Sequence, residues 1–254
     1  MPVCPRCQQE VPAGDKFCPN CGYQLEEATS SSPGGLEEGV HLSPGARAGA
    51  ETIMVGDYQI KPGYYIKTGW EIFKQNIPGF IGFTVLVFLI PLVLIGLLGR
   101  FGQLIHLIIS GPLSAGWYVV SAKLLQRQPT QFSDFFAGFH YFLPLLLYTV
   151  VGTVLISLGF LLLVVPGIYL FVCYTFAALL ILDRRLDFWP AMELSRKTVH
   201  RQWFGVFVFI LALVLLNVGG ALLLGIGLLV TIPWSLCAIT VAFDDIFGLK
   251  ATSY

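Results

Sequence analysis

Three long stretches without charge dominate the hydropathy pattern of the second part of the chain. They cover residues 77–122, 141–182 and 202–243, and only the first contains a charged residue, Arg100, close to its middle. One crossing of a bilayer needs about 20 apolar residues at about 1.5 Å of rise each. Because each stretch is about twice that long, the pattern predicts two transmembrane helices in each.

Residues that break helices lie near the middle of each uncharged stretch. They are Gly96, Gly99 and Gly102 in the first, Pro166 and Gly167 in the second, and Gly219, Gly220, Gly225 and Gly227 in the third. Proline removes a backbone donor and glycine tolerates left-handed conformations, so the chain can turn back there. We therefore predict an all-α integral membrane fold of six transmembrane helices, paired as three hairpins. The expected ranges are 77–98, 103–124, 141–163, 167–183, 204–223 and 228–247.

A polar segment rich in aromatic residues precedes each stretch. The three segments read GYYIKTGWEIFKQN from 63, FSDFFAGFHYF from 132 and FWPAMELSRKTVHRQWF from 188. Their recurrence at roughly 60 to 70 residues favours a threefold internal repeat. A second interpretation is that every membrane hairpin needs an interfacial lead-in and a turn. Both interpretations stay open on the sequence alone.

The Lys and Arg residues predict the orientation of the helices. If the chain crosses six times, eleven of them beyond residue 60 lie on the side of the two termini, and Arg100 alone lies on the other. The positive-inside rule then places both termini in the cytoplasm. We expect the 183–203 connection to be an interfacial helix that contacts anionic lipid head groups. A docking site for a soluble partner is the alternative for that segment.

Composition agrees with a membrane protein and argues against binding to nucleic acid. Of the 254 residues, 56% are hydrophobic and 12% are charged. The formal net charge is zero, but residues 1–60 carry three basic and eight acidic side chains. Phosphates would repel the net negative charge of this segment. The first residues lack the basic start and apolar core of a signal peptide, so we expect an internal segment to direct insertion.

Four cysteines near the start of the chain form two C-x2-C pairs with ten residues between the pairs. They are Cys4, Cys7, Cys18 and Cys21. Four thiolates match the tetrahedral preference of a closed structural Zn²⁺ site, with Zn–S distances of about 2.3 Å. An iron site and a redox dithiol are the alternatives. A reducing cytoplasm disfavours disulfides, and we expect Cys173 and Cys237 to be buried apolar residues in helices.

The cysteine segment resembles the short zinc-ribbon modules found at the N-termini of many bacterial membrane proteins. The resemblance covers residues 3–24 and includes the knuckle glycine Gly22, whereas Gln8 stands where glycine is common. The predicted organisation is a zinc ribbon at 1–24, a flexible acidic linker rich in Ser, Gly and Pro at 25–60, and a six-helix membrane domain at 61–254.

Four motifs in the membrane segment also carry a resemblance. They are GPLSAGWYVVSAKLL from 111, FSDFFAGF from 132, PGIYLFVCYTFAALLILDRRLDFWPAMELSRKTV from 166 and GIGLLVTIPWSLCAITVAFDDIFG from 225. The segment resembles a bacterial multi-pass family related to the membrane domain of glycerophosphoryl diester phosphodiesterases. The resemblance implies six helices in the cytoplasmic membrane and no particular activity, because the phosphodiesterase catalytic domain is not part of it.

The few polar groups in the uncharged stretches do not predict catalysis. The candidates are His106, Asn217, Asp244 and Asp245. The two aspartates point in different directions on a helix, so we expect them to mark the helix end or to pair with the basic 184–201 segment. Asn217 can bond a neighbouring helix.

We therefore predict a non-enzymatic protein of the cytoplasmic membrane that presents a structural zinc ribbon to a cytoplasmic protein partner. The alternative is a small transporter, permease or lipid-handling protein with a path between the hairpins. Both hypotheses require that the helices are embedded in a lipid bilayer.

Overall fold

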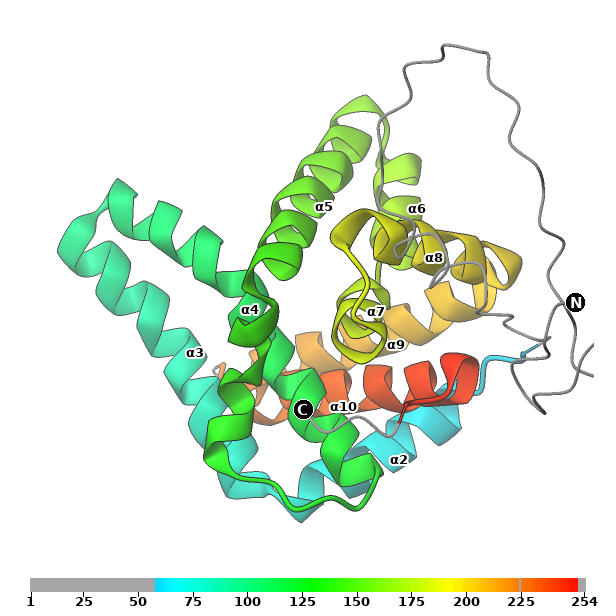
Figure 1. Ribbon diagram of the computed structural model, residues 1–254, viewed down its shortest axis with the longest axis horizontal. Helices are drawn as coiled ribbons and strands as arrows, with labels where there is room; N and C mark the ends of the chain where they lie inside the picture. The colour runs from blue at the N-terminus through cyan, green and yellow to red at the C-terminus, as the bar shows by residue number, and fades with distance from the viewer. Residues whose placement is uncertain (1–57, 224, 251–254) are drawn as a thin grey trace, which may run out of the picture. The chain divides into compact units, whose positions relative to one another are not determined.

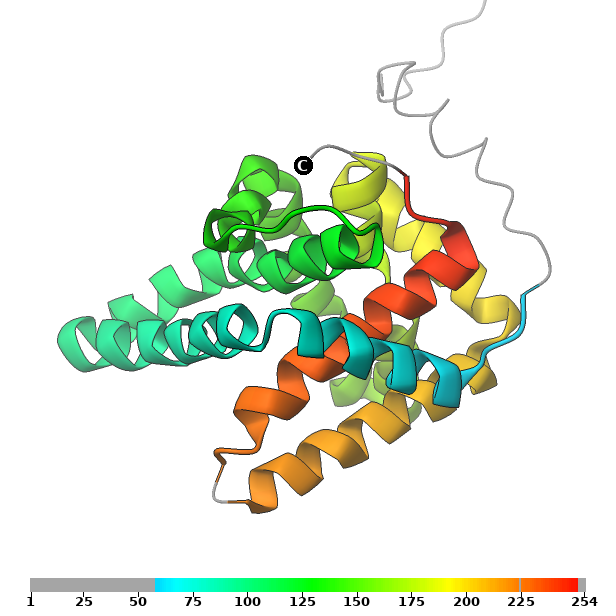
Figure 2. The same cartoon turned by 90° about the horizontal axis from the view of Figure 1, so that it is seen from below.

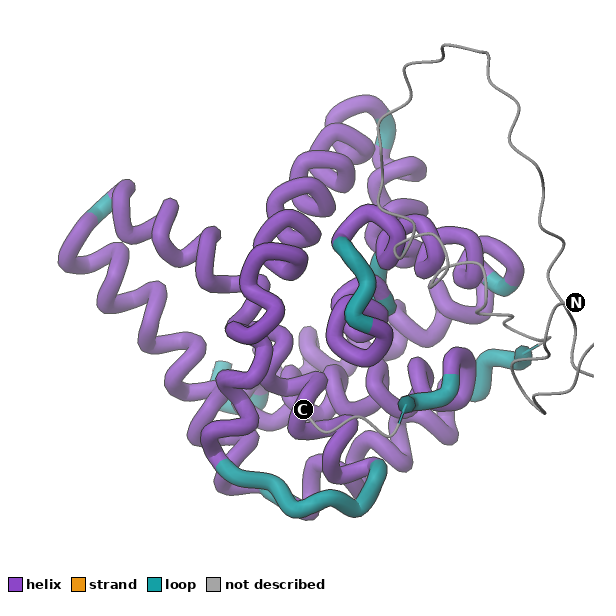
Figure 3. The backbone as a smooth tube through the Cα atoms, in the orientation of Figure 1, coloured by secondary structure: helices purple, strands orange, loops and turns teal. Residues whose placement is uncertain are grey.

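The computed structural model describes residues 58–223 and 225–250. This part of the chain is built from helices and contains no strand (Figure 1, Figure 3). All of it belongs to the second of two compact units, Leu42–Tyr254. The predicted zinc ribbon and nearly all of the predicted linker lie outside the described residues.

The described elements follow one another with short connections. They are α2 (Pro62–Gln75), α3 (Ile77–Leu98), α4 (Arg100–Leu125), the 3-10 helix η1 (Phe132–Tyr141), α5 (Phe142–Leu162), α6 (Val164–Cys173), α7 (Ala177–Arg184), α8 (Phe188–Arg201), α9 (Trp203–Leu222) and α10 (Leu228–Phe247).

Six spans of the described residues are long and apolar enough to cross a membrane, as the sequence predicts. They are α3, α4, η1 with α5, α6 with α7, α9 and α10. Two details differ from the prediction. Helix α4 begins at Arg100 because Gly99 alone, at φ +54°, makes the turn after α3. The predicted fourth helix is interrupted, because α6 ends at Cys173 and α7 begins at Ala177.

The elements follow the same order three times. Each set has a lead-in helix (α2, η1 or α8), then an outer helix (α3, α5 or α9), then an inner helix (α4, α6 with α7, or α10). In their most apolar windows the outer helices are 11%, 17% and 28% buried, whereas the inner helices are 50%, 56% and 56% buried. The sequence repeat thus corresponds to a repeat of elements with matching burial.

The backbone bends in a similar way at one residue of each junction between a lead-in helix and its outer helix: Asn76 and Gln202 lie between their two helices, and Tyr141 is the last residue of η1. The φ and ψ angles are −144° and 52° at Asn76, −109° and 33° at Tyr141, and −130° and 39° at Gln202. These values are far from the helical region, so the helix axis changes direction at each junction. An interfacial helix can therefore turn into a spanning one within one residue.

Contacts between the sets are cyclic. Each lead-in helix packs on the inner helix of another set: η1 on α4, α8 on α6 and α7, and α2 on α10. Figure 2 shows α2 lying across α10. Each outer helix also contacts the inner helix of the same neighbouring set: α5 with α4, α9 with α6, and α3 with α10. The third set therefore contacts the first just as the first contacts the second.

Aromatic side chains pack α3, α4 and η1 against one another in the interior of the unit. The rings of Phe83 and Phe135 stack with centroids 4.6 Å apart, which joins α3 to η1. Trp117 of α4 packs edge-on against Phe83 and donates its indole N–H to the Thr84 hydroxyl at 3.2 Å. Such pairs contribute about 0.5 to 1.5 kcal/mol beyond area burial.

The ends of the spans distant from the lead-in helices expose large apolar side chains. Leu97 is 79% exposed, Leu161 is 82% exposed and Leu222 is 81% exposed. Soluble monomers rarely expose contiguous apolar patches on this scale, because hydration of each Å² of apolar surface costs about 25 cal/mol. These helices are therefore suited to hydrocarbon as their solvent.

Close packing of α2 on α10 depends on Gly69. A Cβ atom at this position would lie 2.7 Å from the backbone nitrogen of Ala238, whereas a Cβ atom at Gly63 of the same helix would meet nothing within 4 Å. We expect Gly69→Ala to lower the free energy of unfolding by about 1 to 3 kcal/mol, as overpacked sites do. Gly63→Ala should leave it unchanged or raise it slightly. Detergent-induced unfolding of the reconstituted protein measures both, and equal effects of the two variants would contradict this packing.

Candidate functional site: a cavity among the spans

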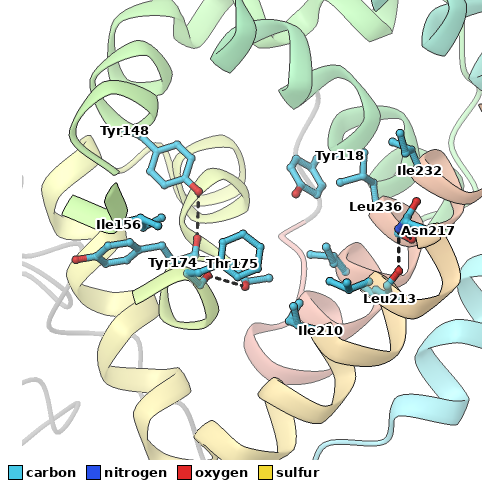
Figure 4. Close-up of a pocket in the computed structure, with 14 residues that line it drawn as sticks. Tyr118, Tyr148, Ile156, Tyr174, Thr175, Ile210, Leu213, Asn217, Ile232 and Leu236 are labelled. Carbon is cyan, nitrogen blue, oxygen red and sulfur yellow. Dashed lines mark hydrogen bonds between the residues drawn. The ribbon is translucent and has the colours of Figure 1, made fainter. Parts of the chain in front are cut away.

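A cavity of about 330 Å³ lies mainly between the second and third sets of helices, and Tyr118 of α4 in the first set completes its wall. Its volume falls at the lower end of the range for ligand pockets, about 300 to 1,000 Å³. Most of its wall is apolar, and its polar groups come from Tyr118, Tyr148, Tyr174, Thr175, Asn217 and Ser235. Figure 4 shows Tyr148 and Tyr174 on one side of it and Leu213 and Asn217 on the other.

The wall of the cavity contains the interruption between α6 and α7. The other two inner helices, α4 and α10, are continuous. Side chains bond two backbone carbonyls at the interruption, and one of these, that of Tyr174, also accepts from the Ala177 backbone at 3.1 Å. The Tyr148 hydroxyl donates to the Tyr174 carbonyl at 3.2 Å, and the Ser195 hydroxyl donates to the Cys173 carbonyl at 2.6 Å. Broken helices at membrane depth are tolerated where protein or a cavity surrounds them, and they often mark binding sites.

Asn217 connects α9 to α10 at one side of the cavity. Its Nδ2 donates to the Leu213 carbonyl and to the Ser235 hydroxyl, both at 2.8 Å, and Ser235 donates in turn to the Thr231 carbonyl at 2.7 Å. Its Oδ1 is buried and has no hydrogen-bond partner among the described residues. The expectation that Asn217 bonds a neighbouring helix is confirmed.

This bond should contribute modestly to stability. We expect Asn217→Leu to lower the free energy of unfolding by about 0.6 to 2 kcal/mol, the range for hydrogen bonds between membrane helices. Ser235→Ala, which removes the same interhelical bond from the other side, should cost a similar amount. The double variant should then cost little more than either single one, measured by the same detergent titration. Additive losses would show that the two residues act separately.

The cavity opens towards the lipid-facing surface between α6 and α9. Phe171 of α6 is 49% exposed and Val214 of α9 is 45% exposed, and both line the cavity. Tyr118 reaches the cavity from α4, and its hydroxyl has no hydrogen bond to any described residue. None of the lining residues is Asp, Glu, Lys, Arg or His. The site is therefore an uncharged recess in the wall of the helix bundle.

The other polar residues singled out in the sequence lie elsewhere. His106 is partly exposed in α4 and does not line the cavity. Asp244 accepts a hydrogen bond from the Leu249 backbone at 2.9 Å after the end of α10, so it marks a helix end as expected.

Asp245 contacts the α2 region and not the basic 184–201 segment. Its carboxylate accepts from the Tyr65 hydroxyl at 2.7 Å and pairs with Lys61 at 3.5 Å. Burial is the main cause that raises the pKa of Tyr65, and the hydrogen bond to Asp245 raises it further.

Helix α8 places charged groups beside the spans. Arg196 donates to both carboxylate oxygens of Glu193, at 2.9 and 2.8 Å, and Lys197 lies 3.4 Å from the same carboxylate. The hydrogen bonds from Arg196 lower the pKa of Glu193. The helix is amphipathic, with Ala191 and Met192 fully packed on its inner face. The helical structure predicted there is confirmed, and its position at the membrane interface stays a prediction.

The six cysteines fall into two groups. Cys173 and Cys237 are buried and unpaired in helices, as predicted, and the Cys237 sulfur lies 3.2 Å from the Ser121 hydroxyl. Over residues 58–250, with residue 224 excepted, no group of His, Cys, Asp and Glu is arranged to hold a metal ion. The predicted ligands Cys4, Cys7, Cys18 and Cys21 lie outside the described residues.

Sequence reasoning missed most of the cavity. The polar residues that it did not single out are Tyr118, Tyr148, Tyr174, Thr175 and Ser235. The available signal was the recurrence of tyrosine within the apolar helices, where a hydroxyl needs a partner. Tyrosine is also common at membrane interfaces, so its presence alone does not separate a cavity wall from an interfacial belt.

Six apolar spans and their apolar exterior indicate an integral membrane protein that carries an uncharged cavity. Residues 3–25 match the family model of a zinc-ribbon domain, so the chain has a zinc-ribbon domain at its N-terminus. Comparison with curated proteins and with solved structures found no match.

Proposed function

We propose that this protein is a non-enzymatic binding protein of the cytoplasmic membrane, whose cavity takes a lipid that enters sideways from the bilayer. The observation that carries the proposal is the uncharged recess at the broken α6–α7 helix, open between Phe171 and Val214. Of the two functions predicted from the sequence, lipid handling is the one that this cavity favours. Its polar groups are too few for a hydrated solute, and no carboxylate, histidine or lysine lines it for acid–base catalysis.

The proposal includes a hairpin arrangement with both termini in the cytoplasm. Two observations support it. Helix α3 contacts α4, α5 contacts α6 and α9 contacts α10. Of the twelve Lys and Arg residues beyond residue 60, all but Arg100 lie in the lead-in helices, in the connections beside them or at the span ends that adjoin them. Protease protection of sealed vesicles that placed the termini on opposite faces would contradict this orientation.

We also propose that the N-terminal domain holds a structural Zn²⁺ through Cys4, Cys7, Cys18 and Cys21 and docks a cytoplasmic protein. The family match over residues 3–25 and the four-thiolate donor set support it. When bound, the metal supplies folding free energy and no catalysis, since four protein ligands leave no open position. The role in docking is tested by crosslinking in cells: partners captured by the natural chain should be lost with Cys4→Ser.

Lipid binding is tested by filling the cavity. We expect the purified natural chain to retain one lipid in native mass spectrometry. The Thr175→Phe variant should lose this lipid, because the larger side chain fills part of the cavity that Thr175 lines. Val154→Phe is the matched control, because Val154 is 58% exposed on α5 and does not line the cavity. Retention of the same lipid by Thr175→Phe would overturn the proposal.

A further inference from the structure

The polar side chains of α4 lie on one face of the helix. At about 3.6 residues per turn, every polar side chain from residue 100 to residue 122 falls within about one third of the circumference. These side chains are Arg100, Gln103, His106, Ser110, Ser114, Trp117, Tyr118 and Ser121, and we call them the α4 polar face. Leu107 is the one large aliphatic residue within the same arc. A span that is otherwise apolar thus carries a polar face along nearly its whole length.

The cytoplasmic end of the α4 polar face meets protein and then the cavity. The Ser121 hydroxyl lies 3.2 Å from the sulfur of Cys237 in α10. One turn before it, Tyr118 lines the cavity. Because these two residues share a face with the polar residues nearer the start of α4, that face continues from the cavity towards Arg100.

Beyond the cavity, the α4 polar face is open to its surroundings. Ser110 and Ser114 are partly exposed, and their hydroxyls donate to backbone carbonyls of α4 itself, at 2.9 and 2.8 Å. The side chains of Arg100, Gln103 and His106 make no hydrogen bond or ion pair with any described residue. Figure 1 shows this part of α4 projecting with α3 away from α5 and α10. Polar groups at membrane depth are costly without polar partners, and they often mark pathways.

The α4 polar face is long enough to reach across most of a bilayer. Arg100 and Tyr118 are 18 residues apart, which is about 27 Å of helix, against about 30 Å for the hydrocarbon core. Between them, successive polar residues are no more than four positions apart, or about 6 Å. The segments around the α5–α6 and α9–α10 turns, 158–168 and 218–230, contain no polar side chain. Polar groups therefore connect the cavity to the far end of the spans along α4 and not along the other turns.

We infer that this protein moves phospholipids passively between the two leaflets, with the head group travelling along the α4 polar face while the acyl chains stay in the bilayer. The inference rests on the proposed lipid cavity and adds an activity to it. The cavity, open to the bilayer at Phe171 and Val214, is one end of the route, and Arg100 is the other.

The residues of the route suit a phospholipid head group. The hydroxyls of Ser110 and Ser114 can turn from their own backbone carbonyls to a phosphate oxygen, since a serine hydroxyl both donates and accepts. Arg100 can form charge-assisted hydrogen bonds with the phosphate where the head group leaves the hydrocarbon. Each polar residue thus lowers the cost of taking the head group out of water. The movement needs no energy source, because it only equilibrates the two leaflets.

A leaflet-specific bleaching assay tests this inference. The full chain is reconstituted in phosphatidylcholine vesicles with a trace of phosphatidylcholine that carries a nitrobenzoxadiazole dye on one acyl chain. Dithionite, which does not cross the bilayer, bleaches only the outer leaflet of protein-free vesicles. We expect the natural chain to let the dye of the inner leaflet be bleached as well, as labelled lipid moves outward.

Three variants connect this movement to the α4 polar face. Ser110→Phe should slow it at least about tenfold, because a ring replaces one polar step of the route. Ser110→Thr keeps the hydroxyl and should keep the rate. Ile108→Phe is the matched control, since Ile108 is 43% exposed and lies two residues away on the opposite face of α4. Cooperative unfolding of each variant in detergent shows that it is folded.

The outcomes separate the inference from the function on which it rests. If the natural chain neither retains a lipid in native mass spectrometry nor exposes the inner dye, both fail. A retained lipid with a protected inner dye would leave the lipid-binding function standing and overturn the inference. Equal slowing by Ser110→Phe and Ile108→Phe would overturn the route along the α4 polar face. A disulfide between two chains of Ser110→Cys, together with a protected inner dye, would show that a second copy covers this face and would also overturn the inference.

Discussion

A chain in which Cys4 is replaced by serine should bind no zinc, whereas the natural chain should bind about one Zn²⁺ ion. Residues 3–25 are too few to bury an adequate core, so the metal supplies most of the folding free energy of such a domain. For structural zinc in small domains this amounts to about 10 to 16 kcal/mol at neutral pH. The expected result is therefore loss of the folded domain and not a partial weakening.

Metal analysis of the purified protein gives the zinc content, and hydrogen exchange over residues 1–25 reports folding. Exchange should be slow in the natural chain and fast in Cys4→Ser or after chelation. Cys237→Ala is the control, because Cys237 is buried in α10 and should not affect zinc. Full zinc content in Cys4→Ser would show that the predicted ligand set is wrong.

Replacing Asp183 by asparagine should lower the free energy of unfolding of the membrane domain by about 3 kcal/mol. Asp183 is 2% exposed, and its carboxylate accepts from the Lys250 backbone at 3.0 Å. Its Oδ2 lies 2.9 Å from Arg184 Nε, close enough for an ion pair but without the alignment of a hydrogen bond. Removal of one partner of a buried ion pair typically costs about 3 to 5 kcal/mol, because the remaining charge is uncompensated.

The lower end of that range is expected because Arg184 keeps other partners. It donates to the Phe247 and Gly248 carbonyls at 2.7 and 2.6 Å, which connects the end of α7 to the end of α10. These bonds satisfy part of the guanidinium after the carboxylate is lost. Asp183 and Arg184 together thus join the second set of helices to the third at the end opposite the exposed apolar tips.

Asp187 provides the matched control for this prediction. It is exposed at the start of α8 and makes no capping hydrogen bond, so Asp187→Asn should change stability by no more than about 0.5 kcal/mol. Adding Arg184→Gln to Asp183→Asn should recover part of the loss, since no charge is then left unpaired. Detergent-induced unfolding measures all of these variants, and a loss in the double variant equal to the sum of the single ones would refute a coupled pair.

The number and positions of the spans were predictable because they depend on local composition. A bilayer requires about 20 apolar residues per crossing, and each uncharged stretch is broken by glycine or proline near its middle. The zinc-ribbon domain was predictable for a similar reason, since two C-x2-C pairs within 18 positions are typical of such a domain. The interruption at Tyr174–Phe176 was not, because those residues are apolar or weakly polar and carry no breaker signal.

By itself, the sequence determined that six helices are apolar enough to cross a membrane, that polar lead-in segments alternate with these spans, and that a zinc-ribbon domain precedes them. Each of these depends on residues close together in the chain. Only the tertiary structure decided that inner and outer helices differ in burial, that the three sets contact one another cyclically, and that Tyr118, Tyr174 and Asn217 share one cavity. Those residues come from three different sets of elements, and their proximity depends on how closely α6 packs against α9, which no local pattern specifies.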